Sequence, residues 1–181
     1  MFGLFSKKNK GVKVADKIWI SDEAKFRACL EFKKSDPNVL FIAWFEETKN
    51  KLQAYFRANH LEERVYLAGY VNFSQADRPL IFVEHHPLGS EEQRKATELG
   101  KDEIVVLSSL SEPFFQSFGG ERIVEMMRKM GMGADEMIEN NMISNSIKNA
   151  QEKIAKKAVI TGAARSQSDW LLNAGVNQQL D

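Results

Sequence analysis

The longest uninterrupted apolar run in the sequence extends from Val39 to Phe45, between the polar residues Asn38 and Glu46. A strand that carries apolar residues on both of its faces is buried on both faces. Such a strand needs a layer of structure on each side, and parallel sheets obtain these layers from helices. The run therefore predicts a parallel sheet that is covered by helices.

Strand-like and helix-like segments alternate around this run. Apolar and polar residues alternate from Val12 to Ile20, Ser21 is a typical helix N-cap, and a helix follows to about Lys34. We expect further strands at 64–71, 79–85 and 104–107, one further helix beginning at Glu46, and another over 90–99 with Ser90 as its cap. Because this alternation is typical of βαβ units, we predict an α/β domain over residues 12–110, with a small, mostly parallel sheet and flanking helices.

Beyond Ser111 the pattern is purely helical. One helix is expected over 121–130 and another over about 140–158, where an apolar stripe recurs at helical spacing. We predict a helical extension over 111–160 that packs on the α/β domain, with docking of the stripe onto a partner as the alternative. Residues 161–181 are rich in Ser, Gln, Asn and Ala, and we predict a mobile tail there.

The overall composition excludes several classes of protein. The 25 basic and 25 acidic residues cancel, which argues against a nucleic-acid-binding protein, because phosphate contacts need a basic excess. The single cysteine, Cys29, excludes an internal disulfide bond and is expected to be a small buried hydrophobe. No apolar run approaches the roughly 20 residues that a membrane-spanning helix needs.

Residues 1–11 form a tail that combines apolar and basic side chains. Phe2, Leu4 and Phe5 are followed by Lys7 and Lys8, which is the reverse of the order in an export signal. These five residues could contact an anionic membrane surface, where each lysine contributes on the order of 1 kcal/mol. The alternative is a solvated chain end.

The sequence lacks the motifs of common nucleotide and metal sites. Gly100 and Lys101 are not part of a P-loop, and the histidines are not spaced to chelate one metal ion. No nucleophile, base and orienting group can be assembled from spacing alone. We therefore predict no catalytic site, no metal and no cofactor.

Polar residues near the carboxyl ends of the expected strands are candidates for a residual ligand site. Open α/β sheets bind ligands at this edge. Glu46, Thr48, His85 and His86 would lie there, with Arg94 as a lone phosphate contact. The alternative for the two histidines is a partly exposed position in a loop.

Residues 118–132 read Phe-Gly-Gly-Glu-Arg-Ile-Val-Glu-Met-Met-Arg-Lys-Met-Gly-Met. This segment resembles bacterial SecA, the preprotein translocase ATPase, at the point where its second RecA-like motor domain passes into the helical C-terminal region. The resemblance continues to residue 154, and weaker matches lie at 39–46 and 81–86. It implies a RecA-like, P-loop NTPase-like fold for the α/β domain.

The sequence departs from the SecA family where the ATP chemistry would lie. Residues 90–100, which are rich in acids, replace the arginine-rich motif, and residues 72–78 replace a Gly-Arg-Gly-Thr-Asp-type motif. The first motor domain, with its P-loop, has no counterpart in this sequence. Because phosphoryl transfer needs a phosphate cradle, a metal and positive charge, ATP hydrolysis is not expected.

The resemblance therefore implies a non-catalytic, SecA-like binding or regulatory module that is linked to protein export or to the membrane surface. Its expected location is cytoplasmic, or peripheral at the inner face of the membrane, and its expected partner is the export machinery or a second copy. The expected contact residues are Arg122, Met126, Met127 and Lys129, with core packing as the alternative for the methionines. The alternative function is a residual nucleotide-binding protein or weak NTPase.

Overall fold

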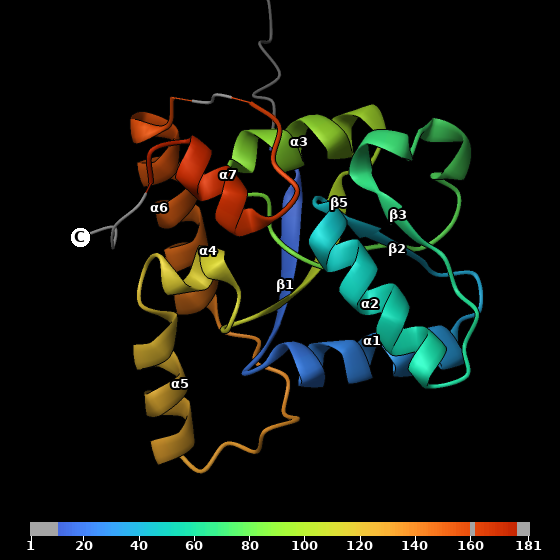
Figure 1. Cartoon of the computed structure of the whole chain (residues 1–181), viewed down its shortest axis with the longest axis horizontal. Coiled ribbons are helices and arrows are strands. Elements are labelled where there is room, and N and C mark those ends of the chain that lie inside the picture. The colour runs from blue at the N-terminus through green and yellow to red at the C-terminus, as the bar shows by residue number, and fades with distance from the viewer. Residues whose placement is uncertain (1–10, 160–161, 177–181) are drawn as a thin grey trace, which may run out of the picture.

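A computed structural model describes residues 11–159 and 162–176 (Figure 1). Within these residues, five parallel strands form one sheet in the order β1-β5-β4-β2-β3. The strands are β1 (Lys13–Trp19), β2 (Leu40–Ala43), β3 (Val65–Leu67), β4 (Leu80–Phe82) and β5 (Glu103–Ser109). All four residues of β2 are buried, so the predicted α/β class and the predicted strand that is buried on both faces are confirmed.

Helices cover both faces of this sheet. The chain moves in one direction across the sheet from β1 to β2 and from β2 to β3, and in the other direction from β4 to β5. Right-handed crossovers therefore place α1 (Asp22–Ser35) and α2 (Glu46–Ala58) on one face and α3 (Gly89–Glu98) on the other. As predicted, Ser21 caps α1, because its side chain accepts a hydrogen bond from the backbone N–H of Ala24.

Two expected strands are shorter than the sequence pattern suggests. The chain leaves β3 through two short 3-10 helices, η1 (Ala68–Tyr70) and η2 (Phe73–Gln75), instead of continuing as a strand. Strand β4 ends at Phe82, so both histidines lie beyond it. The prediction of a Ser90 cap is also wrong, because α3 begins one residue earlier and Leu88 holds the N-cap position.

Two hydrophobic cores lie between the sheet and its covering helices, one on each face, and the helices that follow β5 build a third. These last helices are α4 (Pro113–Gln116), α5 (Gly120–Lys129), α6 (Asn141–Lys157) and α7 (Gln167–Asn173). The predicted stripe of α6 packs into this third core together with residues of β1, α4 and α7. The core includes Ile18, Phe114, Phe115, Ile143, Ile147, Ala150, Ile154, Trp170 and Leu171. Figure 1 shows α4, α6 and α7 gathered on the β1 side of the sheet, and an antiparallel bridge joins Ile18 to Ile138 just before α6.

The prediction of a mobile tail over 161–181 is wrong for helix α7. Ser166 caps this helix, and Trp170 and Leu171 are buried against the third core. The ring of Trp170 also contacts the ring of His86 edge-on, at 5.4 Å between centroids. A Ser- and Gln-rich composition therefore conceals a helix that is held by tertiary contacts.

Two smaller expectations concern Cys29 and the membrane. Cys29 is fully buried as predicted, and burial raises the pKa of its thiol to about 12, so it is protonated at neutral pH. Among the described helices, none combines the length and the apolar character that are needed to cross a bilayer.

Replacing Trp170 by alanine tests the contribution of α7. The substitution leaves a cavity in the third core, and we expect it to lower the free energy of unfolding by about 3 kcal/mol. Leu172→Ala is the matched control, because Leu172 lies on the same helix with 62% of its area exposed and should cost no more than about 0.5 kcal/mol. Urea denaturation measures both values, and equal effects of the two substitutions would contradict the packed position of α7.

Candidate functional site

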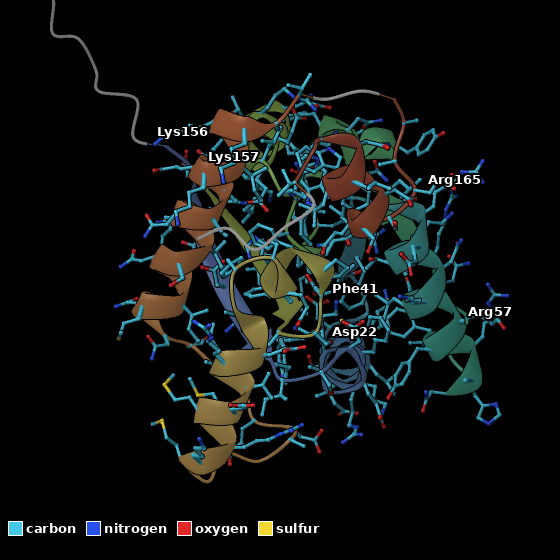
Figure 2. All side chains as sticks on the ribbon, turned by 60° about the vertical axis from the view of Figure 1, so that its left-hand side comes forward. Asp22, Phe41, Arg57, Lys156, Lys157 and Arg165 are labelled. Atoms are coloured by element: carbon cyan, nitrogen blue, oxygen red, sulfur yellow. The ribbon has the colours of Figure 1, made fainter. Side chains whose placement is uncertain are left out.

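A polar cavity of about 270 Å³ lies at the carboxyl edge of the sheet. The chain leaves the neighbouring strands β2 and β4 in opposite directions, and open α/β sheets bind ligands at such a point. The start of α1, the start of α2, the segments after β4 and β5, and the start of α7 contribute its walls. The charged and hydroxyl residues that line it are Asp22, Lys25, Glu47, Thr48, Lys51, Glu84, Ser111, Glu112 and Ser168. Figure 2 marks Asp22 at the start of α1.

Lys25 is the buried cation of this cavity, and only 1% of its side chain is exposed. Its Nζ donates hydrogen bonds to Glu112 Oε1 at 2.7 Å and to the carbonyl oxygen of Val83 at 3.0 Å, and it lies 3.2 Å from Asp22 Oδ1. Burial acts to lower the pKa of Lys25, but the charges of Glu112 and Asp22 outweigh burial and raise it. The lysine is therefore cationic, and its contacts are already made within the protein.

The carboxyl group of Glu84, which lies in the segment after β4, bonds to the N-terminus of α2. Its Oε1 accepts hydrogen bonds from the backbone N–H groups of Trp44 and Phe45, each at 2.9 Å, and its Oε2 accepts one from Thr48 Oγ1 at 2.6 Å. The N-terminus of a helix is a general binding position for phosphates and carboxylates. In this protein a carboxyl group of the chain itself fills that position. Burial raises the pKa of Glu84 to about 7.

Glu112 and Gln167 join the cavity to α7. Glu112 accepts hydrogen bonds from Lys25 and from the backbone N–H of Ser109, and burial raises its pKa. Gln167 donates from Nε2 to the carbonyl oxygen of His85 at 3.0 Å and to Glu112 Oε2 at 3.3 Å. The first turn of α7 therefore lies against the charged group at the cavity wall.

A second charged cluster surrounds His85. This side chain is fully buried, and its Nδ1 lies 2.9 Å from Glu92 Oε1 while its Nε2 lies 3.3 Å from Asp16 Oδ1. Burial acts to lower the pKa of His85, but the carboxylates of Glu92 and Asp16 raise it to about 10, so the ring is cationic at neutral pH. Glu92 also accepts hydrogen bonds from the backbone N–H of His86 and from Gln151 of α6.

Of the five residues proposed for a ligand edge, the structure brings only Thr48 to the cavity wall. Glu46 is exposed, 3.8 Å from Arg165, and Arg94 forms ion pairs with Glu91 and Glu98 on the surface of α3. The alternative of a partly exposed loop position is wrong for the histidines, because His85 and His86 are buried, with 0% and 9% of their areas exposed. The side chain of His86 contacts aromatic rings and accepts the backbone N–H of Leu88.

The proposed contact residues on α5 do not share one face. Arg122, Met126 and Lys129 are exposed, whereas Met127 has 5% of its area exposed and packs in the third core. Met127 therefore corresponds to the core alternative and cannot contribute to a surface. The proposed membrane-contact residues Phe2, Leu4, Phe5, Lys7 and Lys8 lie outside the described residues.

Sequence reasoning missed the residues that define the cavity, namely Lys25, Glu84, Glu112 and Gln167. One signal was present for Lys25, because it lies four residues before Cys29, on the stripe of α1 that packs against the sheet. Among the described residues, no group of His, Cys, Asp and Glu is arranged to hold a metal ion.

Comparisons with known proteins find local similarity to the protein translocase subunit SecA, and no family model matches the chain. The chain is 50% identical over 46 residues to the protein translocase subunit SecA of Acinetobacter baumannii strain AYE. It is 47% identical over 49 residues to SecA of Psychrobacter arcticus. These matches cover 25% and 27% of this chain, respectively, and only 5% of each SecA sequence.

Replacing Glu84 by glutamine tests the raised pKa of this buried group. The folded-state pKa of about 7 exceeds the ordinary value of 4.5, so the folded wild-type protein binds the extra proton and loses stability as pH rises between these values. Glutamine resembles the protonated form. We expect Glu84→Gln to gain stability relative to wild type from pH 5 to pH 8, on the order of 2 kcal/mol.

Denaturation with urea at several pH values measures this difference. Glu47→Gln is the control for removing a carboxylate from the same cavity wall, since 46% of the Glu47 side chain is exposed and loss of its surface ion pair with Lys51 should cost no more than about 1 kcal/mol. A difference between Glu84→Gln and wild type that does not change with pH would exclude the raised pKa.

Proposed function

We propose that this chain is a non-catalytic, SecA-like module that binds or regulates a component of the protein export machinery. The observation that carries this proposal is the combination of local SecA identity with a sheet edge whose ligand position is filled by the chain's own carboxyl groups. The chain spans about a twentieth of SecA, so the activity of the whole translocase subunit is not assumed for it.

The chemistry of the cavity supports the absence of nucleotide turnover. Transfer of a phosphoryl group needs backbone N–H groups and cations directed at the phosphate oxygens. Here Glu84 takes the N–H groups at the start of α2, and Lys25 is neutralised by Glu112 and Asp22. A phosphate in this cavity would meet several carboxylates and lose both of these partners.

The exposed face of α5 supports a role in protein binding. Met126 has 49% of its area exposed and Met130, the C-cap residue of the helix, has 73%. Arg122 and Lys129 add positive charge to the same helix. Flexible, polarizable methionine side chains adapt to the surface of a partner, and arginine is common at protein interfaces.

The location that accompanies this proposal is the cytoplasm or the inner face of the membrane, where the export machinery is accessible. A membrane contact would be made by the apolar and basic tail, with Phe2, Leu4, Phe5, Lys7 and Lys8 as its residues. The partner is a protein of the translocase, with a second copy as the other outcome of the binding experiment below.

Nucleotide binding separates this proposal from the alternative of a residual nucleotide-binding protein or weak NTPase. We expect millimolar ATP or ADP with magnesium to leave the thermal unfolding midpoint unchanged relative to magnesium chloride alone. A nucleotide that bound with micromolar affinity would add about 4 kcal/mol under these conditions. Such a stabilisation, or hydrolysis of ATP above the background rate, would contradict the non-catalytic assignment.

Substitutions on α5 test the proposed protein contact. We expect the wild-type chain to capture translocase components, which mass spectrometry identifies. The double variant Met126→Asp, Lys129→Glu should capture at least about tenfold less, since two interface residues commonly contribute more than about 1 kcal/mol together. Leu172→Asp is the matched control, because it places the same charge on an exposed apolar position of α7. Capture of no translocase component, or equal capture by all three proteins, would contradict the proposal.

A further inference from the structure

Strand β1 lies at the edge of the sheet, and within the described residues its outward backbone groups are paired only at its two ends. Lys13 and Trp19 bond to the β5 side, so the alternate residues direct their N–H and C=O groups away from the sheet. The side-chain amide of Gln93 bonds both backbone groups of Val12, at 2.6 and 2.9 Å. At the other end, Ile18 exchanges two backbone hydrogen bonds with Ile138, at 3.2 and 2.7 Å.

Between these ends, the outward backbone groups of Val14 and Asp16 have no hydrogen-bond partner among the residues that the structure describes. The residue Asp16 as a whole is half-buried, but its side chain is only 3% exposed. Most of its exposed area therefore belongs to the main chain. The chain after Ile138 does not continue the antiparallel pairing, because Asn140 turns away and caps α6. As far as the described residues extend, the middle of β1 therefore offers unpaired donors and acceptors at the spacing of a strand.

A groove of about 290 Å³ borders this open stretch on the side of α3 and α6. Its walls include Val12 and Val14 of the edge, Gln93 of α3, and Lys148, Gln151 and Ala155 of α6. Because the side chains of a strand alternate between faces, a segment paired with β1 would direct every second side chain toward this groove. Most of the surface that lines the groove is apolar, which suits an apolar side chain, and Glu92, Lys148 and Glu152 add charged groups to its walls.

The lysines of β1 indicate the charge of the occupant. Lys13 and Lys17 project on the other face of the edge, with 71% and 25% of their side chains exposed, and each contacts one surface acid. If two copies paired antiparallel about Ala15, Lys13 of one copy would lie opposite Lys17 of the other, which is unfavourable. The chain's own residues 1–10 carry three further lysines and would also add like charge.

We propose that the open edge of β1 binds an extended segment of a partner protein by strand addition, with apolar side chains toward the groove and acidic side chains opposite Lys13 and Lys17. Backbone hydrogen bonds to Val14 and Asp16 supply the pairing, and cross-strand ion pairs supply the preference for acids. This surface is separate from α5, and the proposal does not depend on a link to protein export.

A short synthetic peptide in which Glu and Val alternate is the probe for the full chain. We expect binding by fluorescence anisotropy, together with slower hydrogen exchange of the Val14 and Asp16 amides on addition of the peptide. The same peptide with Lys in place of Glu should bind at least several-fold more weakly. Lys13→Glu should reduce this preference for the acidic peptide.

Val14→Pro removes the outward N–H without removing a bond to β5, and edge strands tolerate proline at such positions. We expect it to weaken peptide binding about tenfold, as loss of a hydrogen bond with steric exclusion predicts. Val14→Thr is the matched control, because it keeps the N–H and the β-branched shape, and it should bind nearly as well as wild type.

Three results would overturn the proposal. One is no binding of the acidic peptide at millimolar concentration, with both amides still exchanging rapidly. Another is protection of these amides in the free protein that disappears when residues 1–10 are deleted, which would assign the edge to the chain's own segment. The last is protection that rises with protein concentration, which would assign the edge to a second copy.

Discussion

The ion pair between Lys25 and Glu112 joins most of the elements that meet at the carboxyl edge of the sheet. Lys25 belongs to α1, Glu112 precedes α4, and the carbonyl oxygen of Val83 that also bonds the lysine follows β4. Removing two charges from water costs several kcal/mol per ion, so this pair is tolerated only when nearly every donor and acceptor around it is satisfied. Ser109 and Gln167 satisfy Glu112, and Gln167 thereby brings α7 onto the edge. The ion pair therefore connects α1 with α7 through Glu112 and Gln167.

The second cluster repeats this principle around a histidine. His85 lies between Glu92 and Asp16, and Gln151 of α6 satisfies the other oxygen of Glu92. In both clusters a buried cation is surrounded by carboxylates, and an amide from the C-terminal helices completes the set. These groups are of the type that bind ligands in other α/β proteins, but here they bond to each other. Stability and ligand binding compete for the same side chains at this edge. Both lysines that line the cavity, Lys25 and Lys51, are paired with carboxylates of the described residues.

The features that sequence predicted correctly are those that depend on local periodicity. The buried strand β2, the capped helix α1 and the stripe of α6 follow from spacing alone. The burial of His85 could not be inferred in this way, because it depends on carboxylates that are contributed by β1 and α3. Trp170 is a similar case, since its polar neighbours predict a tail and only contact with the third core makes the segment a helix. Adjacent residues on a helix face different directions, so Met126 and Met127 cannot both be buried in one core. Spacing alone does not indicate which of the two is buried.

The closed carboxyl edge and the open lateral edge of the sheet have opposite properties. At the carboxyl edge, side chains and helix N–H groups are already bonded to each other, so a ligand would have to displace internal contacts. Along the side of β1, the groups without a partner among the described residues are those of the backbone, and pairing with them would break no bond that the described residues make. The segment between α5 and α6 connects the two proposed binding surfaces, because Ile138 pairs with β1 and Asp135 forms an ion pair with Arg27 of α1. Within the described residues, the Ile18–Ile138 bridge is the only strand pairing that limits the open stretch of β1 on that side. A partner that moved α5 would therefore displace the segment that carries this bridge.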